Sequence, residues 1–394
     1  MLACVLGEMM RVTSVLGYWR HRISDKRRGL LLVLAVALCA AWAVGPMAAT
    51  PALAATRGSA HSPHSPAASS AARAGAVRGP ITSGNSKAHC VTASYPNGVL
   101  TQSIISGITS TTGVTYNCLN VFVNPMPAWS DWDNPWPFRI TSDGWDAWLA
   151  ASSSHQVVMA MDLIPQAVSN TRNPLSWEQS CANGAYNGYA TTLAKNLVSY
   201  GAGSIVIRLG LEANGSWEAD YVGTTSAEMS DWAKCYANEV TAMRAVSGTN
   251  FLFVWNPNIC TANIPLSKWY PGNSYVDIIG ADAYDQDCQS LKTVAQEGWQ
   301  AYSTDSSTKG SSSSDFPSLA NLESFAVAHG KPLSFPEWGL LAGVDDPAYV
   351  TGVTQMFQAD NFSFESYFDV NDDGVAALGP SIPNATAVYV QAFG

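Results

Sequence analysis

The sequence has few charged residues, and basic residues are scarcer than acidic ones. Charged residues make up 13% of the 394 residues, with 20 Lys and Arg against 30 Asp and Glu. The first 55 residues hold six of the basic and two of the acidic residues, so the remainder has a formal net charge of −14. Nucleic acids and anionic membranes are polyanions that would repel such a surface. The composition therefore argues against both partners, whereas a neutral polysaccharide meets no such penalty.

The sequence also lacks the motifs of several enzyme classes. It has no GxSxG, no HExxH, no phosphate-binding glycine loop and no CxxC pair that would indicate zinc. Only His89, His155 and His329 lie beyond residue 85, and none has a convincing nucleophile near it in the sequence. Residues 369–374 begin like a calcium loop, but its twelfth position is Pro380 where a Glu ligand is needed, so a plain turn is favoured. We expect no metal and no cofactor.

The N-terminus predicts an export signal. Five basic residues between positions 20 and 28 precede an apolar run from residue 29 to about residue 44, and Ala52-Leu53-Ala54 follows as a small-x-small cleavage site. We expect a signal peptide over residues 1–55 and a secreted, extracellular protein with no membrane attachment after cleavage; an uncleaved anchor is the alternative. Residues 56–85 are rich in Ala, Ser and Pro and predict a disordered linker, which leaves a folded domain over residues 86–394. We expect this domain to be a monomer.

Six cysteines lie beyond the predicted signal peptide. An even number in a secreted chain favours disulfides, although six cysteines allow fifteen pairings. We expect pairs that are neighbours in the sequence, namely Cys90–Cys118, Cys181–Cys235 and Cys260–Cys288.

Apolar strand-like runs alternate with helical patterns through the folded domain. Eight strands separated by helices over about 300 residues are typical of a (β/α)8 TIM barrel. The predicted strands are residues 91–99, 118–123, 156–164, 204–212, 250–256, 276–284, 332–337 and 362–370, and the clearest helical patterns are residues 186–200, 226–246, 318–329 and 347–360.

Two of these strands end at a glutamate followed closely by an indole and a glycine. The fourth runs into Glu212 with Trp217 after it, and the seventh runs into Glu337 with Trp338 after it. Hydrolysis of a glycosidic bond needs two carboxyl groups, one to protonate the leaving oxygen and one to attack the anomeric carbon or activate water. A tryptophan beside each glutamate offers a flat face to a sugar ring and can desolvate the acid. The plainer interpretation is that Glu212 is a helix N-terminal acid or forms an ion pair with Arg208.

Polar and aromatic residues also follow other predicted strands. They are expected to converge on the mouth of the barrel, where a sugar needs hydrogen bonds and stacking, although some of them could instead pack the barrel top. These residues are Asn124, Asp162, Trp255, Asn256, Asn258, Asp282 and Tyr284. Trp129, Trp132 and Trp136 in the loop after the second strand form either an outer sugar subsite or part of the packing of that loop.

These segments resemble clan A retaining glycoside hydrolases, and in particular glycoside hydrolase family 26, the family of β-mannanases. The resemblance spans most of residues 200–340. It is carried by Arg208-Leu209-x-x-Glu212-x-Asn214-Gly215-x-Trp217, Phe253 to Asn258, Tyr275 to Asp285, and Lys331-Pro332 to Glu337-x-Gly339.

The resemblance implies a secreted endo-hydrolase of a β-linked polysaccharide, with β-1,4-mannan as the first expected substrate, acting with retention. Glu212 would be the acid/base and Glu337 the nucleophile. The expected substrate-binding residues are Arg208, Asn214, Trp217, Trp255, Asp282, Tyr284 and Trp338. Leu211 and Ala213 stand where the family usually has His and Met. A glucanase or xylanase of the same clan, or an inactive carbohydrate-binding protein, therefore remains open as an alternative.

Overall fold

Eight parallel strands close into a barrel in the part of the chain that the computed structural model describes. Each strand pairs with the next one along the chain, and β8 pairs with β1 to close the ring. The strands are β1 (Ala88–Ala93), β2 (Cys118–Phe122), β3 (Gln156–Met161), β4 (Val206–Leu211), β5 (Leu252–Asn256), β6 (Ile278–Tyr284), β7 (Leu333–Leu341) and β8 (Phe362–Asp369). The described residues are 87–93, 102–123, 126–139, 145–169, 176–259, 264–285, 292–305, 314–359, 361–370 and 374–394. The predicted (β/α)8 barrel is confirmed.

The predicted strand positions are close to the observed ones, with two differences at the ends. β1 begins at Ala88, three residues before the predicted start, and residues 94–99 lie outside the described part of the chain. β7 continues to Leu341, beyond its predicted end at Glu337, because its last residues pair antiparallel with β9 (Val375–Ala376). The carboxylate is therefore inside a strand and not at its end.

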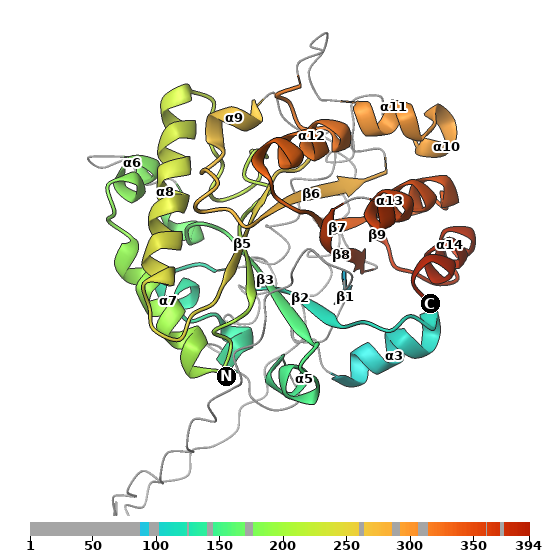
Figure 1. Ribbon diagram of the computed structural model, residues 1–394, viewed down its shortest axis with the longest axis horizontal. Helices are drawn as coiled ribbons and strands as arrows, with labels where there is room; N and C mark the ends of the chain where they lie inside the picture. The colour runs from blue at the N-terminus through green and yellow to red at the C-terminus, as the bar shows by residue number, and fades with distance from the viewer. Residues whose placement is uncertain are drawn as a thin grey trace, which may run out of the picture. The chain divides into compact units, whose positions relative to one another are not determined.

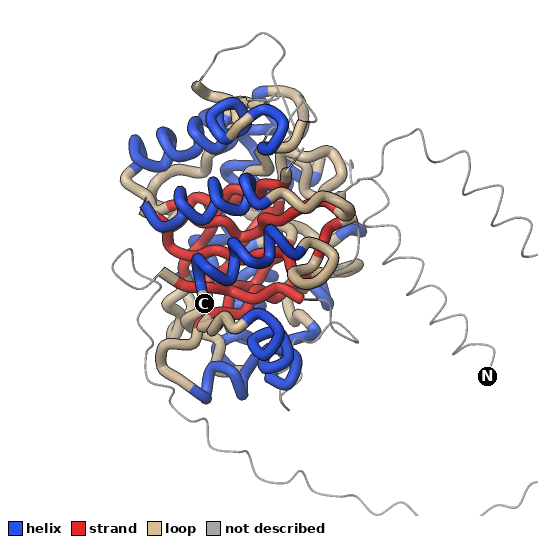
Figure 2. The backbone as a smooth tube through the Cα atoms, turned by 90° about the vertical axis from the view of Figure 1, so that its right-hand side faces the viewer, coloured by secondary structure: helices blue, strands red, loops and turns tan. Residues whose placement is uncertain are grey.

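Helices follow most of the strands and surround the barrel. Figure 1 shows α6 to α9 along one side of the strands and α11 to α14 along the other, and Figure 2 shows strands enclosed by helices in the perpendicular view. The helices are α3 (Gln102–Thr112), α4 (Trp129–Trp132), α5 (Trp145–Ala151), α6 (Trp177–Ala182), α7 (Asn187–Ser199), α8 (Ser226–Arg244), α9 (Leu266–Trp269), α10 (Val294–Glu297), α11 (Trp299–Thr304), α12 (Leu319–His329), α13 (Pro347–Ala359) and α14 (Pro383–Phe393). No helix in the described ranges has the length and apolar character to cross a lipid bilayer.

Local signals fix the ends of the predicted helices. Thr225 caps α8 by accepting a hydrogen bond from the backbone N–H of Glu228, whose carboxylate in turn accepts from the Thr225 N–H. Ser318 caps α12 by accepting a hydrogen bond from the Asn321 N–H, and Gly330 in the left-handed conformation (φ 64°) ends that helix.

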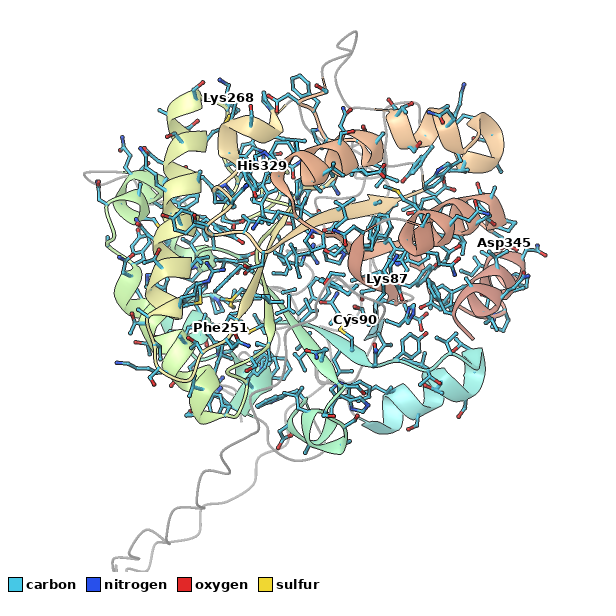
Figure 3. The ribbon with its side chains drawn as sticks, in the orientation of Figure 1. Lys87, Cys90, Phe251, Lys268, His329 and Asp345 are labelled. Atoms are coloured by element: carbon cyan, nitrogen blue, oxygen red, sulfur yellow. A yellow bond between two sulfur atoms is a disulfide. The ribbon has the colours of Figure 1, made fainter. Side chains whose placement is uncertain are left out.

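The barrel interior has an apolar floor below a polar layer. The floor consists of Ala88, Cys90, Cys118, Val158, Val206, Val254, Ile278 and Phe364. A disulfide joins the register partners Cys90 and Cys118 across β1 and β2 within this floor, and Figure 3 labels Cys90 beside β1. A second disulfide, Cys181–Cys235, joins α6 to α8. Two predicted pairings are thus confirmed, while Cys260, Cys288, Asn124 and residues 371–373 lie outside the described residues.

A buried acid beside the second disulfide makes stability depend on pH. Burial, reinforced by the Asp220 carboxyl, raises the pKa of Glu239 well above its ordinary value. The fold then favours the protonated acid, so this contribution is complete below pH 4 and is lost as pH rises through the raised pKa. Glu239→Gln should match the wild type in melting temperature at pH 4 and exceed it at pH 8.

Thermal unfolding across this pH range checks the prediction. A Glu239→Gln variant that parallels the wild type at every pH would contradict the assignment.

Candidate active site

Three carboxyl groups meet inside the C-terminal half of the barrel. Glu212 follows β4, whereas Asp282 and Glu337 lie within β6 and β7. One oxygen of each carboxyl lies within 4.8 Å of an oxygen of both others, and the three residues are at most 3% exposed. The structure therefore brings together both predicted catalytic residues and one predicted substrate-binding residue.

A backbone irregularity directs Glu212 into this group. The register of β4 against β5 shifts between Arg208 and Leu211, and Gly210 (φ 75°) and Glu212 (φ 41°) both have left-handed backbones. A Cβ at position 210 would also lie 2.7 Å from the Trp232 ring. Glycine is therefore required both by the backbone angle and by the lack of space for a side chain. A left-handed glutamate costs about 1–3 kcal/mol, and such strain concentrates at functional sites.

Two donors hold the Glu212 carboxyl in place. Trp217 Nε1 donates to one oxygen at 3.0 Å, and Asn258 Nδ2 donates to the other at 2.9 Å. A Cβ at residue 215 would overlap the Trp217 ring, which accounts for Gly215 in the sequence motif. Trp217 lies beside Glu212 and is partly exposed. Its ring is therefore at the position predicted for a sugar-stacking surface.

Asn214 bonds the β5 loop that carries Asn258. Its Nδ2 donates to the Asn258 carbonyl at 2.8 Å, and the Asn258 backbone N–H donates to its Oδ1 at 2.9 Å. Both polar atoms of this fully buried amide are used within the protein. The structure thus gives Asn214 a role in positioning Asn258, and its contact with substrate stays a prediction. Asn258 was predicted only to lie at the mouth of the barrel, because nothing local in the sequence indicates its bond to Glu212.

Glu337 has a different environment from Glu212. Tyr284 Oη donates to one of its oxygens at 2.6 Å, and Arg208 Nη1 donates to the other at 3.3 Å. A cation and a hydroxyl donor both favour the ionised carboxylate. The surroundings of Glu337 therefore suit a nucleophile, and they place Arg208 and Tyr284 against this side chain.

Arg208 is the cation of the group. It is completely buried and also pairs with Asp282 through Nη2. Burial would lower the pKa of Arg208, but the three surrounding carboxylates outweigh burial and raise it above its ordinary value. Removing one partner from a buried ion pair typically costs about 3–5 kcal/mol, so we expect Arg208 to be indispensable to the folded site.

Asp282 allows the group to retain a proton. Burial raises the pKa of Asp282 well above its ordinary value; Arg208 opposes this rise, and the neighbouring carboxylates and a hydrogen bond with Glu212 add to it. One cation faces three carboxyls, so full ionisation of all three would leave net negative charge in a buried space.

Trp255 and Trp338 lie apart from the carboxyl group, although both were predicted to contact substrate. Each is fully buried and belongs to the apolar core outside the strands. Trp255 packs on Trp269 at 4.5 Å between ring centroids, and Trp338 packs on Tyr367 at 5.0 Å. Successive residues of a strand point to opposite faces, so the residue after the inward Glu337 points outward. The structure gives both indoles packing roles.

Two groups in the described residues have the residue types of a metal site. In the first, Arg208 already supplies the positive charge beside Glu212, Asp282 and Glu337. In the second, Cys181 and Cys235 face Glu239, but their sulfurs are joined in a disulfide and are not available as thiolate ligands.

Comparison with known families adds an independent observation. The sequence model of Glycosyl hydrolase family 26 matches residues 192–298, a stretch that runs from α7 through β6 and includes Arg208, Glu212, Asp282 and Tyr284. Over these residues the chain is similar to glycoside hydrolase family 26. The resemblance predicted from the sequence is thereby confirmed. A comparison with curated protein sequences finds no match.

Solved structures show that the family 26-like chain shares its barrel with mannanases. The Bacillus subtilis mannanase BCman is 17% identical, with 79% of this chain and 87% of that chain covered and a TM-score of 0.50. The GH26 β-mannanase BoMan26A from Bacteroides ovatus is 12% identical, with 77% and 87% covered and a TM-score of 0.51. A modular endo-β-1,4-mannanase from Cellulomonas fimi is 18% identical, with 78% and 70% covered and a TM-score of 0.50. At these identities the likeness is one of fold.

Proposed function

We propose that the family 26-like chain is a secreted endo-glycoside hydrolase that cleaves a β-linked polysaccharide, β-1,4-mannan first, with retention of configuration. The observation that carries the proposal is the separation of at most 4.8 Å between oxygens of Glu212 and Glu337. Retaining enzymes place their two carboxyls about 5–5.5 Å apart, while inverting enzymes need at least about 6.5 Å to admit a water between carboxyl and sugar. The spacing favours direct attack by a carboxylate.

In the first step, Glu337 attacks the anomeric carbon while Glu212 protonates the departing glycosidic oxygen. Arg208 and Tyr284 hold and aim the Glu337 carboxyl through their contacts at 3.3 Å and 2.6 Å. Glu212 gives its proton to the leaving oxygen. The anomeric bond to the leaving sugar breaks as the ester to Glu337 forms.

In the second step, Glu212, now ionised, takes a proton from water as that water attacks the glycosyl ester. Trp217 and Asn258 hold the Glu212 carboxyl throughout by their hydrogen bonds at 3.0 Å and 2.9 Å. Two displacements at one carbon return the β configuration, and both carboxyls recover their starting protonation.

Mannan is proposed from the named activity of the similar proteins, two of which are an endo-β-1,4-mannanase and a β-mannanase. Leu211 precedes Glu212, is 3% exposed and pairs in register with Asn256. A buried apolar side chain offers no hydrogen bond to a sugar hydroxyl, so this position can change which sugar is accepted without changing the two carboxyls. Secretion and a monomeric state are proposed from the N-terminal sequence and the acidic composition.

Release of reducing sugar from a panel of polysaccharides tests the proposal. The panel holds galactomannan, glucomannan, mixed-linkage glucan, xylan and β-1,3-glucan, and Glu337→Ala serves as the blank. Activity on the two mannans is expected. Activity confined to a glucan or xylan would keep the chemistry and replace the substrate, whereas binding without release from any polymer would indicate a carbohydrate-binding protein.

An aromatic pair near the site supports action on a polymer. Trp129 and Tyr189 stack with ring centroids 4.1 Å apart and planes at 5°, and Tyr189 is 37% exposed. Trp132, one turn after Trp129, donates its indole N–H to the Asp162 carbonyl just beyond β3. The adjacent Leu163 N–H donates to Asp220 in the loop that follows Glu212 and Trp217. The stacked pair therefore lies on the catalytic end of the barrel beside β3 and β4.

Trp129→Ala should reduce kcat/KM on polymeric substrate by up to about tenfold, since one aromatic contact contributes about 0.5–1.5 kcal/mol. Hydrolysis of a trisaccharide, which is too short to reach the pair, should be unchanged. Tyr275→Ala is the control, because the half-buried Tyr275 precedes β6 at the opposite end of the barrel. Equal losses on polymer and trisaccharide would show that the pair only packs the loop.

A further inference from the structure

β7 is irregularly paired on both sides where it carries Glu337. Gly280 of β6 pairs with Ser334, whereas Asp282 pairs with Glu337, so the register against β6 shifts between these two pairs. Its register against β8 shifts between Phe335 and Trp338. The regular pairing is therefore interrupted directly before Glu337 and resumes where Glu337 pairs with Asp282 and Trp338 pairs with Tyr367. Side-chain bonds on either side of Glu337 add to this pairing in positioning the carboxylate.

Two side-chain hydrogen bonds hold the stretch from inside and outside the barrel. On the inside, Asn120 Nδ2 donates to the Pro336 carbonyl at 2.7 Å. On the outside, Trp338 Nε1 donates to Glu365 Oε2, also at 2.7 Å. These bonds act on the residues directly before and after Glu337.

Glu365 is an unusual residue in this outer layer because it is a fully buried carboxyl in the middle of β8. Its Oε1 contacts His89 Nδ1 of β1 at 3.2 Å and accepts a hydrogen bond from Tyr389 Oη of α14 at 3.4 Å. Its other oxygen accepts from Trp338. The Glu365 carboxyl thus joins three strands of the barrel to the last helix. A buried carboxyl is stable only where such hydrogen-bond partners surround it.

The partners of Glu365 are themselves fixed by packing. His89 is about a quarter exposed and lies 4.5 Å from the Phe393 ring and 5.6 Å from the Phe357 ring, on α14 and α13. Lys87, labelled beside α13 in Figure 3, donates to the Gln358 carbonyl at 3.0 Å. The start of β1 is therefore anchored against both helices, which gives Glu365 a rigid support.

We propose that Glu365 is a positioning residue for Glu337. Its bond to the Trp338 indole braces β7 directly after the irregular stretch, and so holds Glu337 at its contacts with Tyr284 and Arg208. The inference rests on the proposed function, because it takes Glu337 as the nucleophile.

Trp338→Phe removes the indole N–H and keeps an aromatic ring. We expect kcat to fall by about 10- to 100-fold with little change in KM, because a small displacement of a reacting group has an effect of this order.

Trp148→Phe is the matched control. Trp148 is also buried and donates its indole N–H, at 2.9 Å, to the Gln156 carbonyl at the N-terminal end of β3. It should lose similar stability without a change in kcat. If Trp338→Phe behaves like Trp148→Phe once the folded fraction is matched, the bond is only structural and the proposal fails.

Two variants of Glu365 distinguish the loss of the hydrogen-bond acceptor for the Trp338 indole from the loss of the carboxyl group itself. Glu365→Gln keeps an oxygen that accepts from the indole and should retain most of kcat, whereas Glu365→Ala should reproduce the loss of kcat expected for Trp338→Phe. Equal kcat in the two variants would overturn the proposed hydrogen-bond role.

Crystal structures of the variants provide a readout that needs no turnover. In Trp338→Phe and Glu365→Ala the distance from Tyr284 Oη to Glu337 should lengthen from 2.6 Å to beyond hydrogen-bonding range, while Trp148→Phe should preserve it. An unmoved Glu337 would refute the positioning role even if the wild type hydrolyses no polysaccharide. Such inactivity would refute the proposed function but not the positioning.

Discussion

Replacing Glu337 by alanine is expected to reduce kcat on polysaccharide by at least about 10⁴-fold, because loss of a nucleophile removes the covalent route altogether. Binding of the polymer should remain close to that of the wild type. The proposed sugar-contacting rings, Trp217 and the Trp129–Tyr189 pair, form no hydrogen bond with Glu337 among those found in the described residues. Initial rates and affinity electrophoresis in the same polysaccharide give the two quantities.

Added azide provides the stereochemical control for this variant. A small anion can occupy the space of the missing carboxylate and attack from the same face, so Glu337→Ala with an activated β-glycoside should form the α-glycosyl azide. Recovery of the β-azide, or activity retained without azide, would assign the nucleophile to another residue.

Replacing Glu212 by alanine has the second largest expected effect. Loss of a general acid typically costs about 10²–10⁴-fold, and the cost depends on how much protonation the leaving group needs. Glu212→Ala should therefore be severely impaired on polysaccharide, yet form the glycosyl-enzyme rapidly from a dinitrophenyl glycoside, whose leaving group departs unprotonated. A burst of phenolate followed by slow turnover is the expected time course.

Azide distinguishes this variant from the previous one. It should accelerate breakdown of the glycosyl-enzyme of Glu212→Ala and yield the β-glycosyl azide, because the attack follows a first displacement by Glu337. Loss of the burst on the activated substrate would show that Glu212 does not act as the acid/base.

Strand order, and with it the approximate position of the site, could be predicted from the sequence. Short apolar runs ending in Glu212 or containing Glu337 indicate parallel strands whose carboxyl ends converge, and the fold confirms that convergence. The sequence gives no sign of the left-handed backbone at Glu212 or of the β4 bulge, because these depend on pairing with β5.

Aromatic residues next to the glutamates were the weakest guide to the site. Trp338 adjoins Glu337 in sequence but points to the opposite face of β7, whereas Trp217 returns to Glu212 through a turn made possible by Gly215. Glu365 was overlooked for the converse reason. A single acid in an apolar strand has no local pattern, and its importance lies in partners on β1, β7 and α14.

The most direct test of the double-displacement account is to trap the glycosyl-enzyme. The protein is incubated with a 2-deoxy-2-fluoro β-glycoside of the preferred sugar bearing a good leaving group, and then examined by intact-mass and peptide mass spectrometry. The account predicts one adduct per chain, on the peptide that contains Glu337, and none in Glu337→Ala. An adduct on Glu212 would contradict the account. So would hydrolysis that forms no adduct and releases the α-anomer as its first product.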